Sequence, residues 1–417
     1  MRNPEQVQRQ KTRVVITGLG VVSPIGVGTE DFWSAALSGR VGTSSITQFD
    51  TSAFLTSKGG EVKDFEPGRF IKKLPYEELS RSTQFAVGVT GMALEDAGLL
   101  NSGAERDRIG VSFGVVIGNR PSAESHVRNL HAQRDQAVAG FNSTTSHDPT
   151  MVSRMPAIEF GLSGPNIVIP TACAAGNGAI GYAMDMIRAD RADVMVAGGA
   201  DEMSLTMFMM FNSFRALAPE AVQPFDKNRQ GLMLSEGAAA VVLESYEHAR
   251  NRGASIYGEV LGHGNFADAH HMTAPHPEGL GAIRSMRAAL KMSGVSPEQV
   301  DYINAHGTGT PINDLVESKA IRTVFGHAAD SIPVSSIKSM LGHTQGAASA
   351  IEAVTCLLAI RDHVIPPTMN YVETDPECKL NIVANAAYPK MVNVALNNAF
   401  GFGGNISCTV FSSLREM

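Results

Sequence analysis

The amino-acid sequence predicts an α/β protein built from two similar halves, with buried parallel sheets covered by helices on both sides. Strand–turn–helix units recur in both halves of the chain, and no short-period repeat or low-complexity segment interrupts them. At 417 residues the chain exceeds the usual size of one hydrophobic core, which favours two or three domains or one large duplicated domain. A hydrophobic content of 43% with 18% charged residues is typical of a tightly packed, soluble enzyme.

Short apolar runs alternate with helical segments through the first half of the chain. In chain order, the patterns predict a strand at 14–16, a helix at 30–37, irregular surface structure over 41–80, a helix at 82–97 and a strand at 109–113. The run NIVIP then leads through a turn into an amphipathic helix that opens with small residues. The remaining strands lie in VMVAGGADE, GAAAVVLE and YGEVLGHG, and a short helix separates the last two.

The second half repeats the same alternation, which is why a duplicated architecture is predicted. Its expected elements are a helix at 281–292, a strand in YINAH, a helix after Asn313, a strand in VSS, a helix at 346–360 and strands in VALNNAF and NISCTVF. We therefore divide the chain into a mobile N-terminal arm (1–12), a first half (13–262) and a second half (263–417).

Composition and charge exclude several classes of function. The formal net charge of −7 argues against nucleic-acid and anionic-membrane partners, and no apolar run approaches the roughly 20 residues needed to span a bilayer. The start, MRNPEQVQRQKTR, has no apolar core, so a signal peptide is not expected. The four cysteines show neither a C-x-x-C pair nor metal-ligand spacing, so free thiols, a cytoplasmic location and no metal site are expected.

Cys173 is the strongest candidate nucleophile, because it lies at a strand-to-helix turn in PTACAAGNG. Unpaired backbone N–H groups and the positive end of the helix dipole favour thiolate over thiol at such a position. The alternative is a buried cysteine that acts only as a small hydrophobic residue. The small residues that follow leave room for a substrate, which favours catalysis. Cys356 and Cys408 lie among apolar residues and are expected to pack in the core.

Two histidines and a lysine follow strands of the second half. His306 ends the strand in YINAHGTGTP, and Lys338 and His343 surround a turn in VSSIKSMLGHTQG. Ligands bind at the strand ends of α/β sheets, and the adjacent glycines let a substrate come close. Two neutral imidazoles can donate to a carbonyl oxygen and so stabilise an enolate as a carboxylate leaves. Glu352 is the natural partner of Lys338; the alternative is a surface ion pair of negligible worth.

The motifs PTACAAG, NAHGTGTP, KSMLGH and NAFGFGG, in this order and spacing, resemble those of the β-ketoacyl-acyl carrier protein synthases of the thiolase superfamily. The resemblance extends over nearly the whole chain, from VVITGLGVVSPIG to SCTVF. It implies a five-layered αβαβα fold made from two similar halves and a dimeric enzyme. The implied reaction is a decarboxylative Claisen condensation of an acyl thioester with malonyl-acyl carrier protein. No cofactor is implied, since the substrates are carried on the phosphopantetheine of the carrier protein.

Carried over by position, the resemblance assigns roles to the candidate residues. It implies that Cys173 is the acyl-accepting nucleophile, and that His306 and His343 stabilise the enolate formed when the malonyl group loses its carboxylate. Lys338 is implied to pair with Glu352 and to support the histidines.

The resemblance also implies an oxyanion hole formed by the backbone N–H groups of Cys173 and Phe402, with the Phe402 side chain as the gate of the acyl pocket. Ile117 corresponds to the base of that pocket. The other implied pocket positions are Phe211, Phe400, Thr308 and Thr310, and the implied carrier-protein contacts are Arg215, Lys72 and Lys73. The methionines of MSLTMFMMF either pack in the core or line a tunnel for long or conjugated acyl chains.

Asn313 and Asp314 stand where the housekeeping fatty-acid enzymes of this type carry Gly-Asp, and they resemble the ketosynthase subunits of bacterial type II polyketide systems. This favours a specialised ketosynthase that pairs with a nucleophile-free, chain-length-factor-like homologue. The alternatives are a homodimeric fatty-acid elongation enzyme, a non-catalytic partner subunit and a hydrolytic cysteine enzyme. The intact set of Cys173, His306, Lys338 and His343 argues against the last two.

Overall fold

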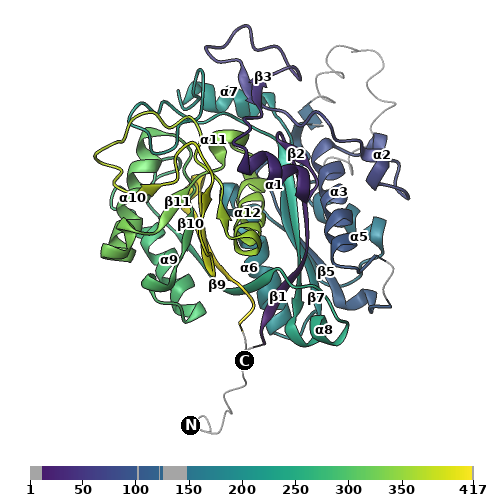
Figure 1. The fold of residues 1–417 in the computed structure, drawn as a ribbon. Coiled ribbons are helices and arrows are strands. Elements are labelled where there is room, and N and C mark those ends of the chain that lie inside the picture. The colour runs from purple at the N-terminus through teal and green to yellow at the C-terminus, as the bar shows by residue number, and fades with distance from the viewer. Residues whose placement is uncertain (1–11, 101–102, 122, 125–147, 416–417) are drawn as a thin grey trace, which may run out of the picture.

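Two helices, α6 (Ala175–Arg188) and α12 (Ala348–Asp362), pack against each other at the centre of the molecule (Figure 1). The structure is a computed structural model that describes residues 12–100, 103–121, 123–124 and 148–415. A half-sheet lies on each side of the helix pair, and one buried apolar cluster joins α6, α12 and strands of both halves. The two halves therefore share one core rather than forming separate domains.

The two half-sheets have the same order of strand directions. The first runs β6 (Asn166–Ile169), β5 (Ile109–Gly114), β7 (Val194–Asp201), β8 (Gly237–Ser245) and β1 (Val14–Ser23). The second runs β11 (Pro333–Ser335), β10 (Tyr302–Asn304), β15 (Val394–Gly401), β16 (Asn405–Ser412) and β9 (Gly258–Ala267). In each, the first three strands are parallel and the last two are antiparallel to their neighbours. This internal repeat confirms the predicted duplication.

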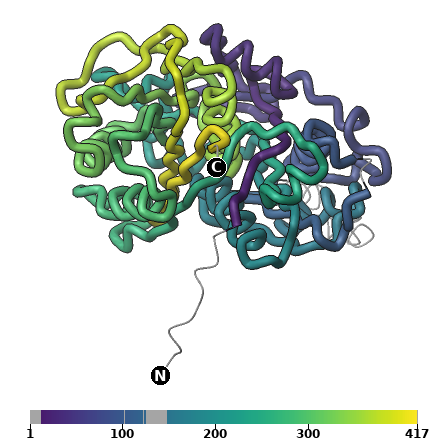
Figure 2. Tube along the Cα trace, turned by 60° about the horizontal axis from the view of Figure 1, so that its bottom comes forward, coloured from purple at the N-terminus to yellow at the C-terminus, as the bar shows by residue number. Residues whose placement is uncertain are grey.

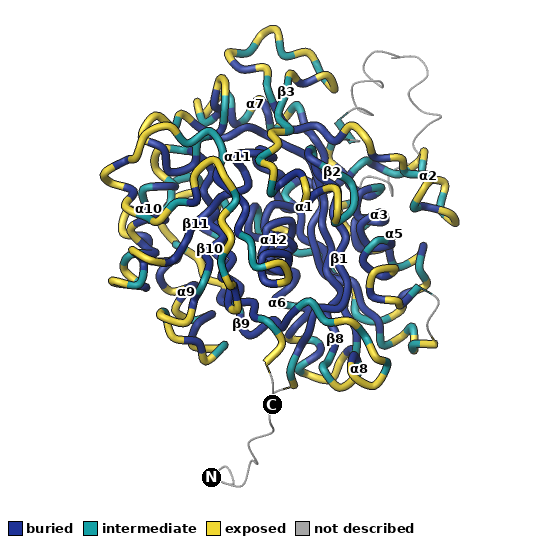
Figure 3. The backbone as a smooth tube through the Cα atoms, viewed as in Figure 1, coloured by how far each residue is buried: buried dark blue, intermediate teal, exposed yellow. Residues whose placement is uncertain are grey.

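Outer helices cover the far face of each half-sheet, and the layers alternate α, β, α, β, α (Figure 1). On one side these are α3 (Arg81–Asp96) and α5 (Met151–Phe160), and on the other α9 (Leu280–Ser293) and α10 (Pro311–Phe325). Burial follows the layers, with buried residues concentrated in the sheets and central helices (Figure 3). Gly18 of β1 lets α3 approach, since a Cβ there would lie 2.1 Å from the Ala93 carbonyl oxygen. The predicted five-layered α/β fold is confirmed.

The expectation of parallel sheets is wrong for the strands nearest the junction. β8 and β1, like β16 and β9, run antiparallel, and a short β1–β9 pairing joins both half-sheets into one hydrogen-bonded sheet, which has 12 strands among the described residues. A buried antiparallel strand has the same continuous apolar pattern as a buried parallel one, so its direction is not readable from composition. The boundary predicted after residue 262 falls inside β9.

The segment 41–80 is largely irregular, as predicted, but it contains β3 (Thr43–Ser45), β4 (Lys58–Gly60) and α2 (Pro67–Phe70). Phe49 and Phe54 fix it to the protein by packing against Phe208 of α7 (Leu205–Ser213), with ring centroids 5.5 Å and 5.2 Å from the Phe208 ring. The remaining elements are β2 (Gly26–Val27), α1 (Thr29–Leu37), α8 (Tyr246–Asn251), α11 (Lys338–Leu341), β12 (Val364–Ile365), β13 (Asn381–Ile382) and β14 (Tyr388–Pro389).

The described ends of the chain lie close together (Figure 2). The Arg13 guanidinium donates to the backbone carbonyl of Arg415 at 2.8 Å. The predicted N-terminal arm lies almost entirely outside the described residues, so its mobility stays a prediction. Within the described part of the chain, no helix is both long and apolar enough to cross a membrane.

Candidate active site

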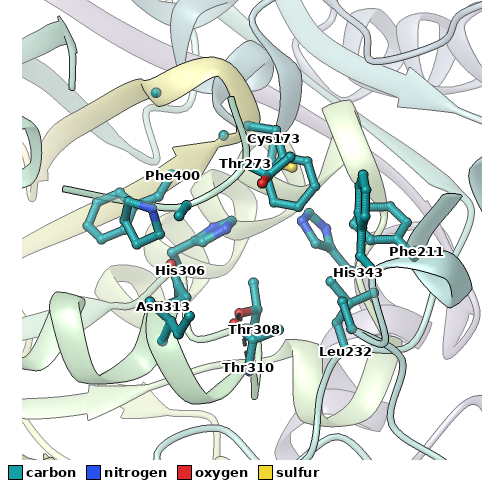
Figure 4. A pocket seen from close by; sticks show the side chains of 18 of the residues that line it. Cys173, Phe211, Leu232, Thr273, His306, Thr308, Thr310, Asn313, His343 and Phe400 are labelled. Carbon is teal, nitrogen blue, oxygen red and sulfur yellow. Dashed lines mark hydrogen bonds between the residues drawn. The ribbon is translucent and has the colours of Figure 1, made fainter. Parts of the chain in front are cut away.

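A cavity of about 440 Å³ brings together side chains from both halves of the chain (Figure 4). Cys173 comes from the first half, and His306 and His343 come from the second. Polar groups on its wall include Thr273, Thr308, Thr310 and Asn313, and apolar ones include Phe211, Phe214, Leu232, Phe400, Phe402 and Ile406. A thiol and two imidazoles facing one mostly apolar space are suited to chemistry on a thioester.

Cys173 lies in a 3₁₀ turn, Ala172–Ala174, that leads directly into α6. Ala172 has a φ of 53°, a left-handed conformation that is costly for a residue with a Cβ. The Ser349 hydroxyl of α12 holds this turn by donating to the Cys173 carbonyl oxygen at 3.2 Å, and it accepts from the Asn177 backbone N–H at 3.0 Å. The turn that carries Cys173 is therefore held by a residue from the other half of the chain.

Burial raises the pKa of the Cys173 thiol to about 12, although the Lys338 ammonium lowers it in part. The expectation that the helix terminus favours thiolate is therefore wrong for the resting enzyme. Cys173 is only 9% exposed, and desolvation is the largest contribution, so the charged form is disfavoured.

Both histidines are neutral in this cavity. The pKa of His306 and that of His343 are lowered well below the usual value of 6.5, first by burial and then by the nearby Lys338 ammonium. The two rings lie with their centroids 5.5 Å apart and their planes at 80°. A neutral imidazole carries one N–H and one acceptor nitrogen, so the tautomer decides what each ring offers to the cavity.

The hydrogen bonds at Nδ1 determine the tautomers. The backbone N–H of Gln345 donates to His343 Nδ1 at 3.2 Å, and Lys338 Nζ lies 3.4 Å from His306 Nδ1. An ammonium group has no acceptor, so His306 Nδ1 accepts from Lys338. Each ring therefore carries its hydrogen on Nε2, and the two rings point toward the space in front of Cys173 (Figure 4). The site offers two neutral N–H donors.

Lys338 and Glu352 form an ion pair inside the protein, their side chains being only 2% and 1% exposed. The alternative of a surface pair of negligible worth is thus excluded. Burial raises the pKa of Glu352 to about 7, while the Lys338 ammonium lowers it. Losing one partner would leave an uncompensated buried charge, which typically costs about 3–5 kcal/mol. Lys338 thus has two functions, since it completes this pair and orients His306.

Two carboxylates that the motif analysis assigned no role hold the His306 loop from α10. Glu317 accepts from the backbone N–H groups of His306 and Gly307, both at 2.8 Å. Asp314 accepts from the Gly309 N–H at 3.2 Å and from the Asn313 side-chain amide at 3.1 Å. Asp314 and Glu317 are three residues apart on a helix, a spacing that puts both on one face. The spacing of the two acidic residues in TPINDLVE is the sequence feature from which their shared role at the His306 loop could have been predicted.

Comparison with known proteins agrees with this geometry. Residues 11–249 match the family described as beta-ketoacyl synthase, N-terminal domain, and residues 257–372 match its C-terminal domain. The chain belongs to the β-ketoacyl synthase family. It is a ketosynthase, an acyltransferase that condenses acyl thioesters.

Curated relatives and solved structures resemble this ketosynthase over almost its full length. It is 43% identical to 3-oxoacyl-[acyl-carrier-protein] synthase 2 of Coxiella burnetii, over 98% of this chain and 100% of that protein. The corresponding enzyme of Synechocystis is 41% identical, over 95% of this chain and 97% of that protein. The structure of the ishigamide ketosynthase/chain length factor matches with 40% identity and a TM-score of 0.93, over 97% of this chain and 99% of that chain. A type II polyketide ketosynthase in complex with its acyl-carrier protein matches with 34% identity and a TM-score of 0.89, over 97% of this chain and 100% of that chain.

Phe400, in β15, and Phe402, in the turn after it, both line the cavity of this ketosynthase. The Phe402 ring is 5.5 Å from that of Phe211, and the Phe400 ring is 5.6 Å from that of His306. A Cβ added at Gly401 would lie 3.1 Å from the Cys173 backbone nitrogen, a tight contact, so Gly401 packs closely against the Cys173 turn. Phe402 directly follows Gly401 in the chain; its part in an oxyanion hole stays a prediction. Thr308 and Thr310 share a hydrogen bond of 2.8 Å at the polar wall.

The remaining predicted positions lie at the cavity mouth or away from it. Arg215 lines the cavity, whereas Lys72 and Lys73 do not, their backbone N–H groups being bound by Glu159. Ile117 is buried but lies outside this cavity's lining. Met207, Met209 and Met210 also lie outside it; Met207 and Met210 pack in the aromatic cluster around Phe208, and Met209 is half exposed. Motif reasoning missed Phe214, Leu232 and Thr273, which belong to no recognisable pattern.

Proposed function

We propose that this ketosynthase runs its condensation on Cys173, with His306 and His343 as donors to the enolate, in a specialised acyl-chain or type II polyketide system. The observation that carries the proposal is the pair of neutral imidazoles presenting Nε2–H groups to the cavity that holds Cys173. The reaction is balanced without a redox or metal step, so we propose no resident cofactor. Four free cysteines suit a cytoplasmic location.

In the first half-reaction, Cys173 Sγ attacks the carbonyl carbon of an acyl group carried as a thioester on the phosphopantetheine arm. The Cys173 proton ends on the departing phosphopantetheine sulfur, so a new acyl thioester replaces the old one. Backbone N–H groups of Cys173 and Phe402 stabilise the tetrahedral oxyanion. Because the resting thiol is protonated, we expect thiol deprotonation and thioester attack to be coupled.

In the second half-reaction, the malonyl group loses its carboxylate as CO₂, and the electron pair of the broken bond forms an enolate. Nε2–H groups of His306 and His343 donate to the enolate oxygen, each contributing about 3–4 kcal/mol if well placed. The enolate carbon then attacks the acyl group on Cys173, whose sulfur leaves as a thiolate and regains its proton from solvent. Neutral imidazoles suit this role, since the lowered pKa of each ring leaves its Nε2 hydrogen as a donor rather than a transferable proton.

Two observations bear on the pathway. Asn313 lines the cavity and orients its amide against Asp314, so the departure from Gly-Asp falls inside the site. The ishigamide ketosynthase/chain length factor aligns over 97% of this chain. Both support a polyketide-type subunit. Fatty-acid elongation is the second candidate, favoured by 43% identity to a 3-oxoacyl-[acyl-carrier-protein] synthase 2.

We expect this chain to form a heterodimer with a nucleophile-free homologue when the two are co-expressed. Native mass spectrometry of the chain alone, and with candidate homologues encoded beside it, measures which complex forms. The Cys173→Ala variant is the matched control and should assemble equally well, because assembly does not require the thiol. A stable homodimer that is fully active on its own would favour the fatty-acid alternative.

Replacing Ile117 by phenylalanine should shorten the acyl chains that the enzyme accepts. If Ile117 forms the base of the acyl pocket, the larger ring removes volume and leaves the catalytic groups in place. Overpacking costs about 1–3 kcal/mol, and about 1.4 kcal/mol corresponds to tenfold in rate. Acylation should therefore fall about tenfold or more for long chains and remain near normal for short ones.

The measurement for Ile117→Phe is the acylation rate across a chain-length series, with melting temperatures alongside. Ile158→Phe, at an exposed position of α5, is the control and should change neither quantity. A uniform loss at all chain lengths, together with a lower melting temperature, would show that Ile117 only packs the core.

A further inference from the structure

Asp201 is a completely buried carboxylate at the end of β7 that does not line the cavity. Its oxygens accept hydrogen bonds from four backbone N–H groups. Oδ2 accepts from Val116 at 2.7 Å and Gly346 at 2.8 Å, and Oδ1 accepts from Ile117 at 3.1 Å and Gly118 at 2.9 Å. One side chain thus joins the loop after β5 to the turn that follows His343.

The Gly346 contact leads directly to His343. Gln345, between them, has a φ of 55° and donates its backbone N–H to His343 Nδ1 at 3.2 Å. The Gln345 side-chain amide donates to the Glu202 carbonyl oxygen at 3.1 Å, so the end of β7 holds this turn twice. The bond to Nδ1 is the one that leaves the His343 hydrogen on Nε2.

The Gln345–Gly346 turn packs tightly against its neighbours. A Cβ built at Gly346 would lie 2.6 Å from Asp201 Oδ2 and 2.7 Å from the backbone of Val115. Residue 346 therefore has to be glycine, and residue 201 has to offer an acceptor to its backbone N–H. A carboxylate is the side chain that accepts at both oxygens, whereas an asparagine would turn an NH₂ group toward two N–H donors.

We propose that Asp201 is a positioning residue for condensation: it fixes the Gln345–Gly346 turn so that His343 keeps its Nε2–H directed at the enolate. The proposal rests on the proposed function, since it takes the condensing role of His343 as its starting point. It assigns no contact between Asp201 and the substrate. The Cys173 carbonyl oxygen has its own hydrogen bond, from Ser349, so we expect the acylation step to depend less on this turn than condensation does.

The test measures the two half-reactions separately by rapid mixing, with acyl-carrier protein first and malonyl-carrier protein added to the acylated enzyme. In Asp201→Asn, acylation should stay within about threefold of the unmodified enzyme. Condensation should fall about tenfold or more, within the roughly hundredfold that a 1 Å misplacement can cost. Equal losses in both steps, or no loss in either, would overturn the proposal.

Two further variants keep the result interpretable. Glu244→Gln removes another fully buried carboxylate, one bound to Arg252 on the far side of β8; it should lower the melting temperature and leave the ratio of the two rates unchanged. Gly346→Ala breaks the same contact from the other side. If both act through one link, the double variant Asp201→Asn/Gly346→Ala should be no slower than the slower single variant. Additive losses would contradict the link.

The outcome also separates this proposal from the proposed function. If His343→Ala condenses normally, the role of His343 is wrong, whatever Asp201 does. If His343→Ala fails to condense while Asp201→Asn condenses normally, the role of His343 stands and that of Asp201 is wrong.

Discussion

Replacing Cys173 by alanine should abolish transfer of an acyl group to the enzyme. All four cysteines of the chain are buried, and burial raises the pKa of each thiol, so acidity does not select the nucleophile. The nucleophile is selected by its position, because Cys173 is the cysteine that lines the cavity within the described structure. Its sulfur faces the space that a carrier-bound thioester must enter, whereas the others pack among core residues.

The measurement is intact mass after incubation with acyl-carrier protein, followed by mapping of the modified peptide. The unmodified enzyme should gain one acyl mass on the peptide that contains Cys173. Cys378→Ala, which removes a buried thiol outside the cavity, is the matched control and should acylate normally. Acylation that persists in Cys173→Ala would place the nucleophile elsewhere.

Replacing either histidine by alanine should stop condensation while leaving acylation largely intact. Each ring supplies one neutral N–H donor, and losing a donor to a developing oxyanion costs roughly 10²- to 10³-fold in rate. His306→Ala and His343→Ala should therefore accumulate acyl-enzyme that releases little product when malonyl-carrier protein is added. Single-turnover experiments that follow both steps provide the measurement.

His327→Ala is the control for the histidine variants, since His327 is exposed and lies outside the cavity. It should match the unmodified enzyme in both steps. If a cavity-histidine variant that retains its melting temperature fails chiefly at acylation, that histidine acts as a base toward Cys173 or orients it.

Hydrophobic periodicity predicted most of the secondary structure, because the periods of helices and strands can be read from neighbouring residues. The strand expected at 109–113 is Ile109–Gly114, and the helix expected at 82–97 is Arg81–Asp96. The helix expected after Asn313 begins earlier, at Pro311, because proline suits the first turn of a helix. Strand direction was not predictable in the same way, since it depends on which distant strand becomes the neighbour.

The identities of the site residues were readable from motifs, but their physical states were not. The raised pKa of the Cys173 thiol depends on its burial in the folded protein, and the burial of Lys338 and Glu352 depends on both half-sheets packing over α12. Distant segments create these environments only after folding. The importance of Asp201 could have been predicted from the sequence, because an acidic residue at the end of a fully buried strand needs hydrogen-bond donors nearby.

The central helix pair has a consequence for protein synthesis. Translation delivers the first half of the chain before the second, and the core that the two halves share cannot form until both are present. Without α12, the turn at Cys173 lacks the Ser349 hydroxyl that holds it, and the inner face of the first half-sheet is covered by α6 but lacks α12. His306, His343 and Phe402 have not yet been made at that stage. A ribosome-bound chain therefore has no assembled site to load with an acyl group, and the enzyme becomes reactive only once its C-terminal strands have docked.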